Sequence, residues 1–168
     1  MIEQYDNIVP PIIQKDIVNS LSDENFSWFL KENNKKEHYF EHILFHNGLI
    51  NSSFYDIIVE PIVSIVKKKT YLDISNLIYA KAIFNSNTKQ NVSQWVYDVY
   101  TLIYCVEDSY SDIIVKRKDE NNYPDYFECK KGRIILTDND EIINDKNLEG
   151  NKKIIMIQFA NLKTKEIQ

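Results

Sequence analysis

The pattern of hydrophobic and polar positions changes at about residue 71 of this chain. Before that point, two stretches repeat apolar residues at helical spacing. The first follows a pair of prolines and places Ile13, Ile17 and Leu21 on one face. Proline suits the first turn of a helix, because the N–H group that it lacks would have no partner there. The pattern therefore predicts a helix that begins at about residue 11.

The second helical stretch runs from about residue 53 to residue 68. Pro61 lies inside it and predicts a kink, because proline removes one hydrogen bond of the helix. A run of three lysines follows, which suits the negative end of the helix dipole. The apolar stripe of this predicted helix consists of Ile57, Ile58, Ile62, Ile65 and Val66.

After residue 71, short segments rich in isoleucine, valine, tyrosine and phenylalanine alternate with polar turns, as is typical of strands. The predicted strands lie within 76–85, 100–108, 112–118, 126–138 and 152–162. This order predicts an α+β fold that is mainly β, with N-terminal helices packed on one face of a sandwich or barrel. We expect one domain over residues 1–168, with a helical part at about 1–70 and a β part at about 71–162.

The composition of the chain argues against several kinds of partner and against secretion or a place in a membrane. The formal net charge of -5 repels a phosphate backbone, so no nucleic-acid partner is expected. With only three glycines, the chain cannot form a glycine-rich phosphate loop. The N-terminus lacks the basic and apolar start of a signal peptide, and no segment reaches the length of a membrane span. We therefore expect a soluble protein of the cytoplasm that does not bind a membrane.

Several segments occur in an order that resembles a known family. They are YDNIVPPIIQKDIVNSL, FSWF, FEHILFHNG, a helix beginning near NSSFY, NLIYAKAIFNSNT, YTLIYCVEDSYSD and KKGRIILTD. The last three look like an R-x-x-A-N-like strand, a T-x-I-Y-Y-x-N-D-S-D-G segment and a P-x-x-G-R-x-x-x-F-D segment. From Tyr5 to about Leu162, the chain thus resembles the small prolyl-4-hydroxylase-like members of the 2-oxoglutarate/Fe(II)-dependent oxygenase superfamily of phage and marine bacteria.

The resemblance implies a double-stranded β-helix, a cupin-like jelly roll whose mouth holds iron through two histidines and one carboxylate. In the family, the first two ligands form an H-x-D pair, which should fall between Thr88 and Asp98. That window contains no histidine. In the register that best fits the family's spacing, Asn91 and Ser93 take the two ligand positions. Asp98 is the competing candidate for the carboxylate.

The resemblance also implies a second histidine and a basic residue that binds the distal carboxylate of 2-oxoglutarate. Ile143 stands at the distance expected for the histidine. Lys152 and Lys153 stand at the start of the last long strand, where the basic residue is expected. A lysine can pair with a carboxylate as a point charge, whereas asparagine, serine and isoleucine are not competent iron ligands. Three of the four functional positions thus carry residues that cannot perform the family's role and the fourth is only compatible, which indicates a vestigial iron site.

The chain's three histidines, His38, His42 and His46, lie four residues apart in one segment and are the remaining candidates for a metal site. On a helix, this spacing can hold zinc or nickel. Along a strand, residues four apart are separated by about 13 Å, too far to share one ion. The resemblance favours a strand, so we expect no metal site there.

The sequence favours a non-catalytic, oxygenase-like pseudoenzyme that binds another protein, self-assembles, or forms a structural part of a phage particle or phage–host complex. No cofactor is expected in that case, and a viral protein would lie in the host cytoplasm or with the virion. The alternative is an active Fe(II)/2-oxoglutarate-dependent dioxygenase that uses Asp98, a histidine such as His42, and Lys152 or Lys153. A third hypothesis is binding of a small molecule in the former pocket through Lys153 and Tyr79.

Overall fold

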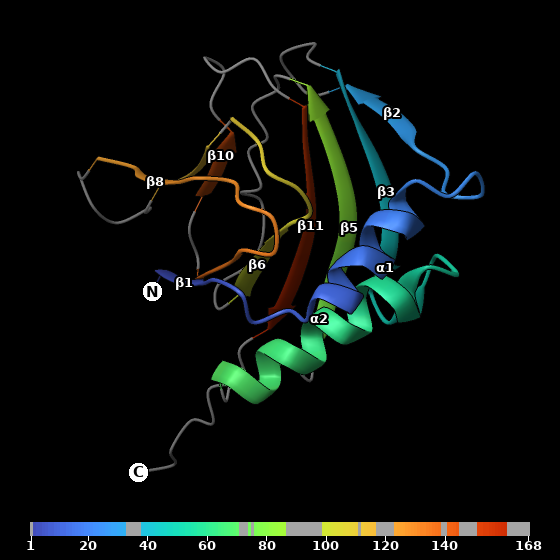
Figure 1. Cartoon of the computed structure of the whole chain (residues 1–168), viewed down its shortest axis with the longest axis horizontal. Coiled ribbons are helices and arrows are strands. Elements are labelled where there is room, and N and C mark those ends of the chain that lie inside the picture. The colour runs from blue at the N-terminus through green and yellow to red at the C-terminus, as the bar shows by residue number, and fades with distance from the viewer. Residues whose placement is uncertain are drawn as a thin grey trace.

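The structure of this chain, a computed structural model, describes residues 2–32, 38–70, 74, 76–86, 99–110, 112–116, 123–138, 141–144 and 151–160. These residues form two helices and eleven strands (Figure 1). The helices are α1 (Pro11–Leu21) and α2 (Tyr55–Thr70). The strands are β1 (Ile2–Tyr5), β2 (Phe29–Glu32), β3 (His38–His46), β4 (Leu49–Ile50), β5 (Leu77–Ser86), β6 (Val99–Cys105), β7 (Ile113–Lys116), β8 (Asp125–Phe127), β9 (Ile134–Asp138), β10 (Glu141–Asn144) and β11 (Asn151–Ala160).

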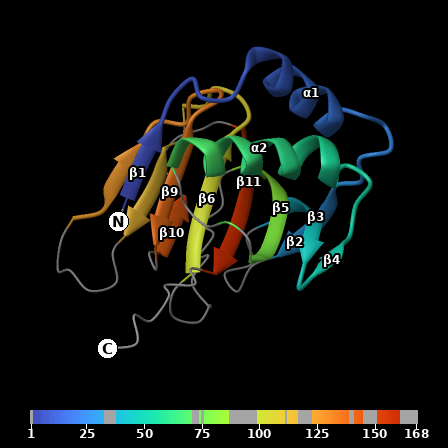
Figure 2. The ribbon, with the colours of Figure 1, turned by 90° about the horizontal axis from the view of Figure 1, so that it is seen from below.

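The strands pair in the antiparallel sense and form two sheets. The larger sheet has the order β1-β9-β6-β11-β5-β3-β2, with β4 paired to β3, and the smaller sheet has the order β10-β7-β8. Figure 2 shows α1 and α2 lying across one face of the larger sheet. The predicted fold is therefore confirmed: it is a mainly β double-stranded β-helix with helices on one face.

Side chains from the two faces of the larger sheet enter two separate cores. Alternate residues of a strand point to opposite faces. In β11, Ile155 and Ile157 pack beneath the helices, in what we call the helix-side core. Ile154 and Met156 pack against β7 of the smaller sheet, in what we call the inter-sheet core. The buried residues of the inter-sheet core are Ile83, Ile103, Cys105, Ile113, Val115, Cys129, Ile135, Ile154 and Met156.

Both predicted helices are confirmed, with small differences in α2. This helix runs two residues beyond the predicted end and continues through Pro61. Its buried face is narrower than the predicted stripe, because Ile57 is 43% exposed. Ile58, Ile62 and Val66 are fully buried in the helix-side core. Within the described ranges, neither helix combines the length and the apolar character that crossing a membrane requires.

The first 70 residues were predicted as the helical part of the chain, with a strand at the histidine segment, and they contribute four strands, β1 to β4, to the larger sheet. β1 pairs with β9 at the edge of that sheet. The turn after β1 is fixed by Asp6, whose carboxylate accepts hydrogen bonds from Nε and Nη2 of Arg133 at 2.7 and 2.9 Å. Nη1 of Arg133 also donates to the carbonyl oxygen of Glu128 at 2.8 Å. One buried guanidinium thus holds the N-terminal strand against the turn that precedes β9.

Candidate functional site

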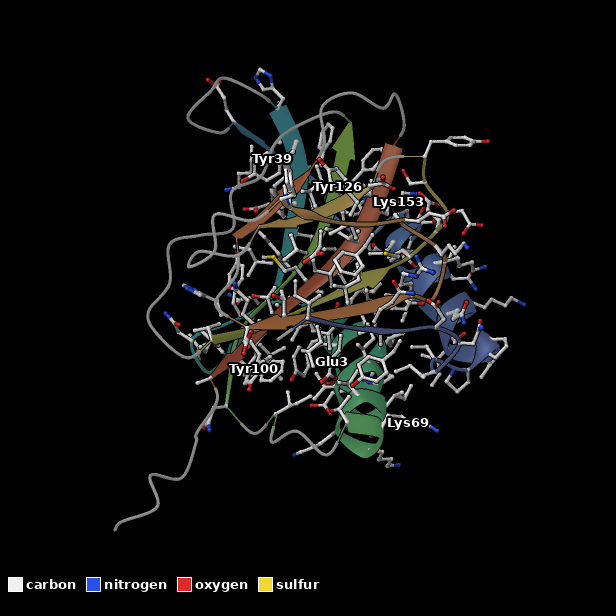
Figure 3. All side chains as sticks on the ribbon, turned by 90° about the vertical axis from the view of Figure 1, so that its left-hand side faces the viewer. Glu3, Tyr39, Lys69, Tyr100, Tyr126 and Lys153 are labelled. Carbon is white, nitrogen blue, oxygen red and sulfur yellow. The ribbon has the colours of Figure 1, made fainter. Side chains whose placement is uncertain are left out.

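The two neighbouring lysines of β11 point to opposite faces of the larger sheet. Lys152 has the same orientation as Ile154 and Met156, and its side chain enters the space between the sheets. Lys153 lies on the other face, where its Nζ is 5.6 Å from the centre of the Phe84 ring. Figure 3 shows Lys153 near the beginning of β11. Of the two lysines considered for the 2-oxoglutarate carboxylate, Lys152 is the one between the sheets.

Lys152 is 2% exposed and is held by the smaller sheet. Its Nζ donates a hydrogen bond of 2.6 Å to the carbonyl oxygen of Asp112, just before β7. Cys105, which stands opposite Ile154 of β11, and Cys129 are buried in the same inter-sheet core. A buried ammonium, a backbone carbonyl and two thiols therefore occupy the same end of the inter-sheet space.

A second polar group in this space is an ion pair between β3 and β5. Nζ of Lys81 lies 3.0 Å from Oε2 of Glu41, and the two side chains are 13% and 9% exposed. The same Nζ lies 5.5 Å from the centre of the Tyr79 ring and 6.0 Å from that of Tyr39. Burial, helped by the nearby Glu41 carboxylate, raises the pKa of both tyrosines. The four residues form a compact charged and aromatic cluster.

Tyr79 was predicted from the sequence as a polar contact, whereas the Glu41–Lys81 pair was not predicted. The available signal was a charged residue at a strand position inside an apolar run, as in FEHILF and YAKAIF. Such residues are rarely buried unless they are paired. The partners are 40 positions apart in the sequence, so nothing local indicates which charge meets which.

A polar row crosses the larger sheet at the other end of the inter-sheet space. Gln158 of β11 stands opposite Tyr79 of β5 on one side and Thr101 of β6 on the other. Nε2 of Gln158 donates to Oγ1 of Thr101 at 3.2 Å, and Thr101 stands opposite Thr137 of β9. Thr101, Thr137 and Gln158 are buried, so hydrogen-bonding side chains line this end of the inter-sheet space.

The three histidines lie on β3 but do not share a site. His38 is exposed, with its Nε2 3.6 Å from Glu32. His42 is buried and stacked on Phe26 of the helix-side core. The strand is irregular between Ile43 and Phe45, so His46 stands opposite Tyr79 and packs edge-on against its ring. Without this bulge, the alternation of side chains along a strand would place His46 on the same face as His42.

Both ring nitrogens of His42 have hydrogen-bond partners. Nδ1 is 2.7 Å from the carbonyl oxygen of Ser27, which can only accept, so Nδ1 carries the proton. Nε2 is 2.7 Å from the hydroxyl of Ser52, which can donate to it. The same hydroxyl accepts the N–H of Phe54 at 3.2 Å, just before α2 begins. His42 therefore joins the segment before β2, the strand β3 and the start of α2.

The positions that the resemblance predicts for the first iron ligands, Asn91 and Ser93, and the competing Asp98 lie outside the described residues. Ile143 is on β10, where it pairs with Ile114 of β7. Within the described part of the chain, no three residues among the histidines, cysteines, aspartates and glutamates are grouped so that they could hold a metal ion.

Comparisons with known proteins identify the fold. No protein-family model and no curated protein matches the chain. An oxidoreductase of the 2OG-Fe(II) oxygenase family from Burkholderia pseudomallei matches with a TM-score of 0.73 and 6% identity, over 95% of this chain and 85% of that one. A prolyl hydroxylase from Trichoplax adhaerens, in complex with a hypoxia inducible factor peptide fragment, gives 0.68 and 7%, over 95% and 83%. A Pseudomonas putida prolyl-4-hydroxylase gives 0.64 and 6%, over 95% and 92%.

These likenesses show an oxygenase-like fold and correct one expectation. No cofactor was expected from the sequence, and this expectation is wrong, because the chain is similar to oxygenases of the 2OG-Fe(II) family. The described residues nevertheless do not fit an iron ion with two imidazole ligands. All three histidines of the chain are described, they lie on one strand, and both nitrogens of His42 are already bonded.

Proposed function

We propose that this chain is an oxygenase-like protein that acts by binding another protein or by self-assembly, rather than by hydroxylating a substrate. The observation that carries the proposal is the placement of the histidines: no two of them meet, and His42 serves the helix-side core. The resemblance to phage proteins extends the proposal to a structural part of a phage particle or of a phage–host complex. Fold alone does not specify function, so the proposal depends on these residues.

An apolar sheet edge supports a binding role. In the described residues, β2 ends the larger sheet, and the short β4 also pairs with β3 (Figure 2). These two strands expose four large apolar side chains by 55% to 68%, which we call the apolar edge: Phe29, Leu30, Leu49 and Ile50. An exposed apolar edge strand offers both backbone hydrogen bonds and apolar area to another chain.

Replacing Leu30 with lysine is expected to abolish association through the apolar edge. A charge on an edge strand blocks pairing because it would have to be desolvated in the interface. Ile12→Lys is the matched control, since Ile12 is 63% exposed but lies on α1 and not on an edge strand. Sedimentation velocity of the purified chain over a range of concentrations measures self-association. Wild type and Ile12→Lys should form dimers or larger assemblies and Leu30→Lys should not; a wild type that stays monomeric would remove self-assembly from the proposal.

The second candidate is an active Fe(II)/2-oxoglutarate-dependent oxygenase with an atypical site, and the buried position of Lys152 favours it. The proposed binding role predicts no succinate above a protein-free blank when the chain is incubated with iron(II), 2-oxoglutarate, ascorbate and air. An active oxygenase predicts succinate that is lost in Lys152→Met and kept in Lys153→Met, because only Lys152 lies between the sheets. Succinate formation with that dependence would contradict the non-catalytic proposal.

A further inference from the structure

β2 is an exposed strand at the edge of the larger sheet. All four of its residues, Phe29–Glu32, are exposed. It pairs with β3 on one side, and in the described part of the chain no strand pairs with its other side (Figure 1). The strand contains no proline, and its pairing with β3 has no register shift. Prolines and bulges are the usual means by which an edge strand avoids further pairing, so β2 is open to a further strand.

A row of apolar side chains crosses the larger sheet, on the face that carries the helix-side core, and ends at β2. Phe84 of β5 stands opposite Phe40 of β3, and their rings stack with centroids 6.0 Å apart. Phe40 stands opposite Leu30 of β2. Leu30 is 59% exposed, so the row ends at the edge with an apolar side chain in contact with water. An apolar side chain on a further strand would continue the row and stabilise it.

The other face of β2 carries an aromatic residue and a charged residue. Phe29 stands opposite Glu41 of β3, and Lys31 stands opposite Tyr39. Nζ of Lys31 is 3.7 Å from Oε1 of Glu41, and the Lys31 side chain is still 47% exposed. The charge of Lys31 is balanced within the strand by that of Glu32. A second copy of this edge is therefore not repelled by net charge, although the whole chain carries a charge of -5.

We propose that β2 pairs with β2 of a second copy of this chain, in the antiparallel sense, around a two-fold axis at Leu30. The inference rests on the proposed function, because it specifies the geometry of self-assembly. A two-fold interface uses the same patch on both copies, so each side must complement itself. The two larger sheets then form one continuous sheet. The row of Phe84, Phe40 and Leu30 continues through the partner's Leu30 into the same row of the second copy.

The two-fold axis leaves few registers. Antiparallel strands that it relates present the same face of the sheet on the same side, so odd-numbered residues face odd-numbered ones. Only an axis at Leu30 or at Lys31 pairs three of the four residues of β2 with the other β2. An axis at Lys31 would place two ammonium groups opposite each other, which is destabilising. An axis at Leu30 instead places Phe29 opposite the partner's Lys31, whose ammonium can lie over the ring.

The size of the contact sets the strength of the dimer. A four-residue strand with a few flanking side chains makes a small interface, and small interfaces are weak. The dimer should therefore form at high protein concentration and dissociate on dilution. A strand from a different protein would not be subject to the two-fold restriction, so the register distinguishes a second copy from another partner.

Single cysteines in the full chain measure the register. Each variant is oxidised mildly at a concentration where the wild type sediments as a dimer, and the linked peptides are identified after digestion. An equimolar mixture of Phe29→Cys and Lys31→Cys should link position 29 to position 31, because facing residues of antiparallel strands lie within the Cα–Cα range of a disulfide. Leu30→Cys should link to itself.

The controls for the cross-links use the same reaction. Phe29→Cys alone and Lys31→Cys alone should link much more slowly than their mixture. Ile12→Cys should not link, since Ile12 is 63% exposed but lies on α1. Links between two copies of position 31, or equal linking at all four positions, would overturn the proposed register.

Charge at position 29 provides a second test, by sedimentation velocity. Phe29→Glu places a carboxylate opposite the partner's Lys31, whereas Phe29→Lys places an ammonium there, and both changes remove the same ring. Within one chain the preference is reversed, because Phe29 stands opposite Glu41. With two such pairs in each dimer, the dissociation constant of Phe29→Lys should exceed that of Phe29→Glu by about tenfold.

The outcomes separate this inference from the proposed function. A wild type that dimerises, with equal dissociation constants for the two Phe29 variants or with the reverse order, would overturn the pairing of β2 with itself and leave self-assembly in place. A wild type that stays monomeric at every concentration would overturn both this inference and the proposed self-assembly, while binding of another protein would remain.

Discussion

Replacing Asp6 with alanine is expected to lower the free energy of unfolding by about 2–3 kcal/mol, because it leaves the guanidinium of Arg133 without its carboxylate. The Arg133 side chain is 8% exposed, so water replaces that carboxylate poorly on the arginine side. The Asp6 side chain is 41% exposed, and solvent screening there keeps the loss below the range for a fully buried pair. Chemical denaturation of wild type and variant, followed by tryptophan fluorescence, measures the difference.

Glu128→Ala provides the matched control. Glu128 pairs with Lys130 at 3.1 Å in the same turn, but both side chains are more than half exposed. An exposed pair of this kind contributes about 0–1 kcal/mol. If Asp6→Ala and Glu128→Ala cost the same, the ion pair between Asp6 and Arg133 would not be what holds β1 in place.

The contribution of Asp6 should also depend on pH. The hydrogen bonds from Arg133 lower the pKa of Asp6 in the folded chain below its ordinary value of 3.8. The stabilisation is therefore complete above the unfolded-state pKa and is lost as the pH falls through the lower, folded-state pKa. Denaturation at a series of pH values should show a difference between wild type and Asp6→Ala that is constant near neutrality and shrinks below about pH 4. A difference that does not change on acidification would contradict the charge pairing.

Replacing His42 with alanine is expected to lower the free energy of unfolding by about 2–4 kcal/mol. The change removes a ring that stacks on Phe26 with centroids 4.1 Å apart, and it deletes both hydrogen bonds of the imidazole. The carbonyl of Ser27 and the hydroxyl of Ser52 would each lose a partner, but Ser27 is exposed and Ser52 is half-buried, so water replaces part of these two bonds. Thermal and chemical denaturation give the loss directly.

His46→Ala separates this structural role from a metal-binding role. His46 is exposed at the end of β3, and its replacement should change stability by no more than about 0.5 kcal/mol. Iron(II) titration of both variants by calorimetry completes the comparison. A His42→Ala variant that keeps wild-type stability but loses affinity for iron would show that His42 is a ligand and not a structural residue.

The alternation of side chains along β11 shows how much of the candidate site could be predicted from the local sequence. Alternation in β11 requires that Lys152 and Lys153 point to opposite faces, and this follows from the sequence once a strand is accepted. Which of them enters the inter-sheet space depends on where the smaller sheet packs, and that is a property of the whole fold. For the same reason, the pairing of Glu41 with Lys81 and the burial of Cys105 and Cys129 in one core could not be predicted from segments far apart in the chain.

The register shift in β3 likewise made the positions of the histidines impossible to predict from the sequence. Their spacing on a regular strand predicts that His38, His42 and His46 share a face, but the bulge before Phe45 places His46 beside Tyr79. β1 and β10 were also missed, because four-residue strands carry little periodicity of their own. β1 is stabilised by its pairing with β9, and β10 by its pairing with β7.

The sequence by itself determined both helices, the long strands and the class of the fold, because apolar spacing and strand propensity act over a few neighbouring residues. It also determined that no histidine follows His46, so two imidazoles could not come from the later strands. Only the tertiary structure decided which side chains meet between the sheets. Those contacts join residues that are distant in sequence, and they depend on strand order, on one bulge and on the side from which the smaller sheet covers the larger.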